Sequence, residues 1–278
     1  MPRAARTSVS ALIEQGARRL RRARVFFGHG TDNARDESAA LVLHALGLAH
    51  TDPAVYARRV GARAQERVRA LLTRRIEERI PAPYLTGESW FAGLPFYVDA
   101  RVLIPRSAIA ELIERRFAPW LEPRRITRVL DMGCGSGCIA IACAKALPWA
   151  QVDAADISTE ALEVAARYDL IVANPPYVGM REFASLPPEY RHEPALALTS
   201  GRAGLDSVRV LLVEARRHLR PGGALIVEVG NTEVALARAF PQLPFLWLQF
   251  ERGGGGVFLL GAEQLPAEGA PRARRAGA

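Results

Sequence analysis

The chain is predicted to fold as an α/β protein with a mostly parallel sheet, preceded by a small helical bundle and a connecting β-hairpin. From Ser107 onward, helical patterns alternate with short apolar runs, which is typical of a parallel sheet covered by helices. Residues 7 to about 80 instead show apolar residues at helical spacing and no convincing strand. With 278 residues, the chain has room for both parts.

Residues 1–85 are predicted to form the helical domain. Asn33 is placed to cap a helix that Gly47 would end, because asparagine accepts hydrogen bonds from the free amides at a helix start and glycine readily adopts the left-handed conformation at a helix end. A third helical region is expected from about Pro53 to Ile80. Apolar residues recur at helical spacing in the first and third regions, at Val9, Leu12, Ile13 and Leu20 and at Val68, Leu71, Leu72 and Ile76.

The apolar period changes in residues 86–106, which we expect to form a β-hairpin that links the two domains. Short strand-like runs flank turn residues at 93–95 and 99–100. The apolar residues of these runs are Trp90, Phe91, Phe96, Val98, Val102 and Ile104.

Residues 107–262 are predicted to form the α/β domain and residues 263–278 a disordered tail. The expected strands cover residues 128–137, 150–158, 169–178, 224–230, 243–252 and 256–261. The expected helices cover residues 108–121, 138–147, 159–167, 206–219 and 231–239, with a turn at residues 220–223.

Composition narrows the class of protein. The net charge of +8 suggests an acidic partner such as RNA, although solvated helix faces and a general preference for arginine also explain it. The sequence has no apolar run long enough to cross a bilayer and no secretory signal, so we expect a cytoplasmic protein without a membrane partner. Cys134, Cys138 and Cys143 have neither disulfide nor zinc-ligand spacing, and we expect no metal.

The run VLDMGCGSG, from Val129 to Gly137, reads as an apolar strand that enters a glycine-rich turn at the start of a helix. Glycines let a ligand approach the backbone amides, but such a turn also occurs without a ligand. Asp156, at the end of the next strand, strengthens the case, because a carboxylate there can accept hydrogen bonds from ribose hydroxyls. The spacing fits neither a dinucleotide fingerprint nor a phosphate loop. We therefore expect a nucleoside-containing cofactor.

The stretch DLIVANPPYV, residues 169–178, has polar and aromatic groups directly after a buried strand. Proline cannot donate to a sheet ladder, so Pro175 must lie at or beyond the strand's end. Ligands bind outside the carboxyl ends of strands in open α/β sheets. Residues 174–177 are therefore a candidate site.

Together, DMGCGSG, Asp156 and NPPY at residues 174–177 resemble the class I S-adenosylmethionine-dependent methyltransferases, and specifically the protein-glutamine N-methyltransferase branch. This resemblance implies a Rossmann-like sheet. The stretches IPRSAIAELI (104–113) and EYRHEPALAL (189–198) are most similar to the enzymes that methylate a glutamine of large-ribosomal-subunit protein L three. The resemblance to these enzymes implies S-adenosyl-L-methionine as the cofactor. It also implies that ribosomal protein as the partner, and proximity to ribosomal RNA.

The resemblance also implies roles for individual residues. The Asn174 side-chain oxygen and the Pro175 carbonyl would accept the two amide hydrogens of the substrate, Pro176 would stiffen the turn, and Tyr177 would pack on the planar amide. The residues implied in cofactor binding are Asp131, Gly133, Cys134, Gly135, Gly137, Asp156 and Asn174. Glu193 and Glu228 are expected to position backbone or loops, and the histidines are assigned no chemistry.

Three alternatives stay open. Release-factor glutamine methyltransferases share the motif but carry a more acidic sequence after the Pro-Arg at residues 105–106. DNA adenine methyltransferases use the same four residues on a flipped base, but this chain has no inserted target-recognition region. A catalytically impaired, ribosome-associated binding protein is the third.

The chain departs from the family pattern between Asp156 and Asp169, where it has only the twelve residues ISTEALEVAARY. Roughly thirty residues are missing there, about one βα unit that would include a strand helping to hold the adenine. The strands that end near Asp156 and Asn174 are expected on opposite sides of the glycine-loop strand. The connecting helix, at 158–167, would then either lie on the opposite face of the sheet or make a rare left-handed crossing.

We predict that the chain still binds S-adenosylmethionine, but more weakly than a member of the family that has this segment, because the adenine loses one wall of its pocket. Isothermal titration calorimetry should give a dissociation constant in the micromolar range. Absence of binding at millimolar cofactor would contradict the assignment as an enzyme.

Overall fold

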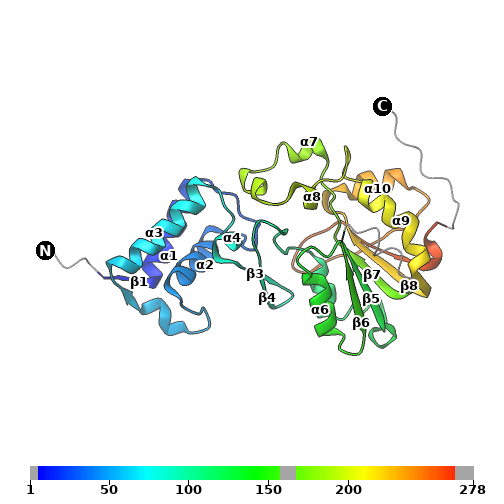
Figure 1. The fold of residues 1–278 in the computed structure, drawn as a ribbon, viewed down its shortest axis with the longest axis horizontal. Coiled ribbons are helices and arrows are strands. Elements are labelled where there is room, and N and C mark those ends of the chain that lie inside the picture. The colour runs from blue at the N-terminus through cyan, green and yellow to red at the C-terminus, as the bar shows by residue number, and fades with distance from the viewer. Residues whose placement is uncertain (1–5, 157–166, 267–278) are drawn as a thin grey trace. The chain divides into compact units, whose positions relative to one another are not determined.

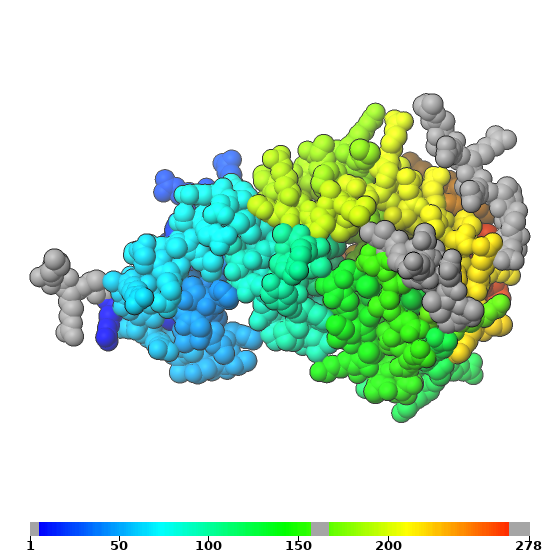
Figure 2. All heavy atoms as spheres, viewed as in Figure 1, coloured from blue at the N-terminus to red at the C-terminus, as the bar shows by residue number. Residues whose placement is uncertain are grey.

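The computed structural model describes residues 6–156 and 167–266, which divide into two compact units (Figures 1 and 2). The first unit contains residues 6–90, 95–106 and 187–193. The second contains residues 91–94, 107–156, 167–186 and 194–266. The short segment 187–193 thus belongs to the first unit although its sequence neighbours belong to the second.

Four helices build most of the first unit: α1 (Val9–Arg22), α2 (Ala34–Leu46), α3 (Ala62–Glu77) and α4 (Ala82–Thr86). The predicted caps are confirmed. The Asn33 side chain accepts hydrogen bonds from the amides of Arg35 and Asp36, and Gly47 ends α2 in the left-handed conformation with φ of 65°. The predicted apolar face of α1 is buried, at Val9, Leu12, Ile13 and Leu20.

The third predicted helical region is interrupted. A 3-10 turn (Pro53–Ala57) and the strand β2 (Arg59–Val60) precede α3, and β2 pairs antiparallel with β1 (Thr7–Ser8). Two-residue strands have no measurable period, so the expectation that residues 7–80 contain no strand was wrong here. The predicted hairpin is confirmed as β3 (Glu88–Phe91) paired with β4 (Leu94–Tyr97).

A fully buried arginine joins three parts of the first unit. The Arg75 guanidinium, on α3, donates to Glu37 Oε1 at 2.8 Å, to Glu189 Oε1 at 3.2 Å and to the Phe26 carbonyl at 2.7 Å. Arg75, Glu37 and Glu189 each have a relative exposure of 0%. Since buried charges are tolerated only when they are paired and hydrogen-bonded, this cluster fixes residues 187–193 to the helices.

The second unit is built on a six-stranded sheet of order β6-β5-β7-β8-β10-β9. The strands β6, β5, β7 and β8 are parallel, and β8, β10 and β9 are antiparallel neighbours. This confirms the predicted α/β class with a mostly parallel sheet. The strands are β5 (Arg128–Met132), β6 (Gln151–Ala155), β7 (Tyr168–Ala173), β8 (Leu219–Glu228), β9 (Leu246–Trp247) and β10 (Val257–Gly261).

Helices lie on both faces of this sheet (Figure 1). Leu130 of β5 packs in one buried cluster with Val208 and Leu212 of α9. Its neighbour Asp131 instead bonds to Ala140 of α6, and successive side chains of a strand point to opposite faces. The helices are α5 (Ile109–Glu114), α6 (Cys138–Ala146), α7 (Met180–Phe183), α8 (Ala195–Leu198), α9 (Asp206–His218) and α10 (Glu233–Ala239).

Three predicted boundaries differ from the structure. The helix expected over 108–121 ends with α5 at Glu114, because Arg116 and Phe117 adopt positive φ angles, which do not continue a right-handed helix. The turn expected at 220–223 lies inside β8, as extra residues between the Tyr168–Leu219 and Leu170–Ala224 pairs. Of the strand expected over 243–252, only Leu246–Trp247 forms a strand, which is β9.

The predicted placement of the strands around the glycine loop is confirmed, because β6 and β7 lie on opposite sides of β5. The expected helix at 158–167 lies almost entirely outside the described residues. The end of the chain is described up to residue 266. It includes a 3-10 turn (Ala262–Gln264) and Leu265, which is buried in the core cluster. None of the described helices combines the length and apolar character needed to cross a membrane.

We predict that replacing the buried arginine, Arg75→Ala, lowers the free energy of unfolding by about 3–5 kcal/mol, because it removes the buried cation that pairs with both Glu37 and Glu189. The matched control is Arg69→Ala on the same helix, whose ion pair with Glu66 is solvent-exposed and should contribute less than about 1 kcal/mol. Urea denaturation of both variants measures the difference. Equal losses would contradict the role given to Arg75.

Candidate active site

The glycine-rich loop after β5 is closed by hydrogen bonds to the end of β6. The amides of Gly133 and Cys134 both donate to the Ala155 carbonyl, at 2.7 and 3.1 Å. Gly133 and Gly135 have φ angles of 77° and 51°, which residues with a Cβ rarely adopt. The loop then enters α6 through Gly137, whose amide donates to the Cys134 carbonyl. The glycines are therefore required by the turn itself.

Asp156 and the glycine loop, both predicted to hold the cofactor, are brought together. The Gly135 amide donates to Asp156 Oδ2 at 2.7 Å. This bond places a carboxylate beside the loop amides at the carboxyl end of β6. Asp156 is exposed at this position.

Asp131, near the end of β5, is fully buried. Its Oδ2 accepts a hydrogen bond from the Ala140 amide at 2.9 Å, whereas Oδ1 has no hydrogen-bond partner among the described residues. Burial raises the pKa of Asp131 to about 7, and the nearby charge of Asp156 adds to the increase. A buried acceptor without a donor is costly, so this carboxyl fits a ligand that supplies a positive or hydrogen-bonding group.

The three cysteines lie in or beside this loop and are free thiols. Burial raises the pKa of the Cys134 thiol, and raises that of Cys138 to about 11. Thiols with a raised pKa are poor nucleophiles at neutral pH. In the described part of the chain, no group of three or more histidine, cysteine or acidic residues could hold a metal ion.

The NPPY residues follow directly on β7, which ends at Ala173. Pro175 is buried, and Asn174, Pro176 and Tyr177 are half-buried. The backbone just beyond them is anchored by Val178, whose amide donates to the Leu198 carbonyl and whose carbonyl accepts from the Ser200 amide, both at 2.9 Å. The motif therefore sits between a buried strand and a fixed loop.

Two glycines that sequence analysis missed shape the surroundings of Tyr177. A Cβ added at Gly230 would lie 2.5 Å from the Tyr177 ring, and one added at Gly204 would lie 2.0 Å from the Tyr177 carbonyl oxygen. At these distances the Tyr177 atoms would have to move to make room for a side chain at either glycine. Gly230 comes shortly after the end of β8, the strand that pairs with β7. Its place after a strand end was the one sequence signal that could have identified Gly230 as part of the site.

The glycine loop and NPPY are neighbours because β5 and β7 are paired in parallel. Met132 is the register partner of Ala173, so the loop and the motif leave the same edge of the sheet on adjacent strands. The chain continues from β5 to β6 on one side, whereas β7 lies on the other. Such a reversal of strand order creates a crevice where ligands bind in open α/β sheets.

The two acidic residues expected to position backbone do so. Glu228 Oε2, at the end of β8, accepts hydrogen bonds from the Ser107 hydroxyl and the Ala108 amide. In the first unit, Glu193 accepts from the Ile104 amide and from Arg106. Burial works to raise the pKa of Glu193, but its close contact with His29 and its hydrogen bonds with Arg106 lower it to about 2.

Comparison with known proteins gives a family and close relatives. Residues 115–167 match the model of the methyltransferase small domain. The chain is 46% identical to the ribosomal protein uL3 glutamine methyltransferase of Xanthomonas campestris pv. campestris, over 93% of this chain and 92% of that protein. It is equally identical to the protein of that name from Bordetella pertussis, over 91% of this chain and 95% of the relative.

The alignment to the Xanthomonas protein runs over 285 positions, more than the 278 residues of this chain. The relative therefore has residues at positions where this chain has none. Among solved structures, the release-factor-specific protein-(glutamine-N5) methyltransferase of Alicyclobacillus acidocaldarius is 28% identical and aligns over 60% of this chain and 98% of its own. The TM-score of this comparison is 0.39.

We predict that Asp131→Asn stabilises the protein increasingly as pH rises. Because burial raises the pKa of Asp131 in the folded state, ionising it costs folding free energy between its unfolded pKa and about 7, whereas asparagine cannot ionise. The free energy of unfolding of the variant relative to wild type should rise by about 3 kcal/mol between pH 5 and pH 8. A difference that stays constant with pH, measured by urea denaturation, would contradict this.

Proposed function

Since the chain belongs to the family of ribosomal protein uL3 glutamine methyltransferases, we propose that it transfers a methyl group from S-adenosyl-L-methionine to the side-chain amide nitrogen of a glutamine in uL3. The observation that carries this proposal is the Met132–Ala173 register, which sets the glycine loop beside NPPY. A ribosomal protein as substrate supports a cytoplasmic location for the enzyme. The net charge of +8 suits work close to ribosomal RNA.

We assign the cofactor to the glycine loop and the two aspartates that flank it. The amides of the Gly133–Gly137 turn would face the bound molecule, Asp156 would accept from ribose hydroxyls, and buried Asp131 would receive the donor that its Oδ1 lacks. S-adenosyl-L-methionine, when bound, supplies an electrophilic methyl group on a positively charged sulfur. A carboxylate at Asp131 would also favour that positive charge.

NPPY is assigned to the substrate amide. An amide nitrogen is a weak nucleophile, because its lone pair is delocalised into the carbonyl. If the Asn174 side-chain oxygen and the Pro175 carbonyl accept the two N–H hydrogens, they hold the nitrogen in one orientation and favour its pyramidal form. The task requires acceptors that are in place before the substrate arrives, and Pro175 and Pro176 restrict this backbone.

Tyr177 is proposed to form one wall for the planar amide. Its position depends on Gly230, which leaves room for the ring, and on Gly204, which lets the chain pass the Tyr177 carbonyl. A side chain at Gly230 would displace the ring, and one at Gly204 would displace the Tyr177 backbone. The stacking surface is thus set by three different segments of the second unit.

We predict that Asn174→Ala lowers kcat for uL3 by at least about 100-fold, in the range seen when one preorganised hydrogen-bonding group is lost. The matched control is Asn33→Ala, which removes the cap of α2 and should cost about 1 kcal/mol of stability while leaving kcat unchanged. Methyl transfer from labelled cofactor to purified uL3 is the measurement.

The same assay tests the competing substrates. Wild-type enzyme should methylate uL3 in preference to a release factor or to duplex DNA. Faster transfer to either of these would refute the substrate assignment. A variant Asn174→Ala with unchanged kcat would refute the role given to the motif.

A further inference from the structure

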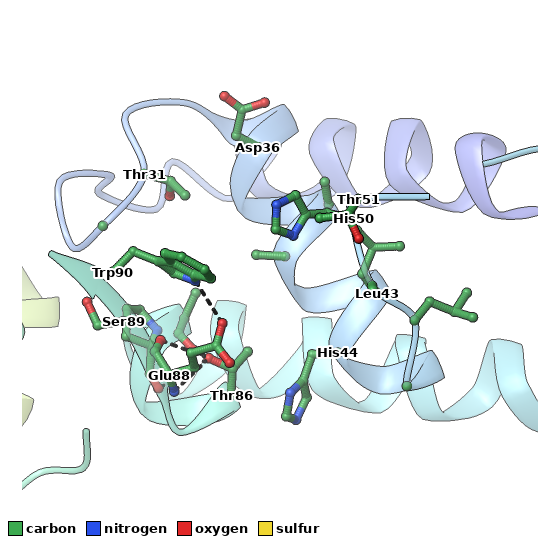
Figure 3. Close-up of a pocket in the computed structure, with 18 of the residues that line it drawn as sticks. Thr31, Asp36, Leu43, His44, His50, Thr51, Thr86, Glu88, Ser89 and Trp90 are labelled. Carbon is green, nitrogen blue, oxygen red and sulfur yellow. Dashed lines mark hydrogen bonds between the residues drawn. The ribbon is translucent and has the colours of Figure 1, made fainter. Parts of the chain in front are cut away.

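A cavity of about 740 Å³ lies in the first unit (Figure 3), whereas the residues assigned to methyl transfer belong to the second unit. The end of α2 and the residues after it form one wall, with Leu43 and His50. The segment from α4 into β3 forms the other, with Glu88 and Trp90. Asp36, on the first turn of α2, also lines it. We call these residues, Asp36, Leu43, His50, Glu88 and Trp90, the acidic pocket.

The charge of this pocket is opposite to that of the chain. The sequence has 37 lysines and arginines and a net charge of +8, yet none of the described residues lining the cavity is a lysine or an arginine. Its carboxylates are Asp36 and Glu88, and among the described residues neither forms an ion pair. Both side chains are exposed. The pocket thus presents negative charge that the protein itself does not neutralise.

Trp90 supplies an aromatic surface next to this charge. Its side chain is 54% exposed, which is unusual for so large an apolar group. The indole N–H donates to Glu88 Oε1 at 2.8 Å, and His50 meets the ring edge-on with centroids 6.2 Å apart. One hydrogen bond uses a small part of the acceptor capacity of a carboxylate. The ring is therefore held in place while Glu88 can still accept from a ligand.

A fixed indole beside a carboxylate is the arrangement that recognises an organic cation. The guanidinium or ammonium group is attracted to the face of the ring and to the negative charge, and its methylene stem covers apolar surface. The wall formed by α2 offers such surface at Leu43, Ala39 and Ala40. RNA would instead meet carboxylates that repel its phosphates.

We propose that the acidic pocket binds an arginine or lysine side chain of the protein substrate, at a distance from the glutamine that is methylated. The inference rests on the proposed function in one respect, that the substrate is a ribosomal protein. Proteins that bind RNA neutralise phosphates with arginine and lysine, so such a substrate and this strongly basic enzyme repel each other over most of their surfaces. The acidic pocket supplies a local attraction.

The first test is steady-state kinetics of the full-length enzyme with uL3. Glu88→Gln and Trp90→Leu should each raise KM for uL3 about tenfold and leave kcat within twofold of wild type, because they touch binding and not the reacting groups. The matched controls are Glu66→Gln, an exposed glutamate of α3 in the same unit, and Trp120→Leu, a tryptophan that is 40% exposed. Both should keep the wild-type KM. An unchanged KM in the two pocket variants, with uL3 still methylated, overturns this inference alone.

The second test needs no methyl transfer. In a heteronuclear NMR spectrum of the full chain, the Trp90 indole resonance is identified by its loss in Trp90→Leu. The peptide acetyl-Gly-Arg-Gly-Arg-Gly-amide should shift it, whereas the same peptide with citrulline for arginine should not. An equal shift with citrulline, or a shift with octauridylate and not with the arginine peptide, overturns the inference. A wild-type enzyme that fails to methylate uL3 overturns the proposed function alone, and the arginine-peptide shift then decides whether the pocket binds cations.

Discussion

The parallel pairing of β5 with β7 is the constraint on which the site depends. The glycine loop leaves the sheet after Met132 and NPPY leaves it after Ala173, and these two residues are register partners. A shift of one residue along either strand would turn its buried side chains to the other face of the sheet. It would also separate the two motifs. Beyond β7, β8 carries Glu228 and Gly230 to the same edge, so the surroundings of Tyr177 follow from the same ladder.

The first unit is organised by charge as well as by its apolar core. Arg75 is buried between Glu37 and Glu189, and buried pairs of this kind specify which segments meet more than they add stability. The acidic pocket uses carboxylates differently, because Asp36 and Glu88 are exposed. In one unit, buried carboxylates therefore pair with an arginine of the chain itself. Exposed carboxylates of the same unit present a negative charge that is complementary to an arginine of another molecule.

The sequence predicted the features that have a local physical cause. Residue type and spacing were enough to predict the caps at Asn33 and Gly47, the buried face of α1, and the end of β7 before Pro175. The strands β1 and β2 were missed because they are too short to show a period, and α5 was overextended because nothing in its sequence signals the positive φ of Phe117. The close approaches at Gly204 and Gly230 depend on which segments meet in space. Residue spacing along one segment does not contain that information.

Because residues 187–193 belong to the first unit, they determine when this unit can finish folding during synthesis. Glu189 and Glu193 leave the ribosome after β5, β6 and β7 have been made, yet they complete the hydrogen bonds of Arg75 and of the Ile104 amide. Domains generally fold as they emerge, starting from the N-terminus. Here the N-terminal unit has to wait for a segment encoded far downstream. A fragment that stops at residue 106 would keep buried Arg75, with Glu37 as its one remaining carboxylate partner in the cluster. The first unit is therefore completed only after much of the second unit has been synthesised.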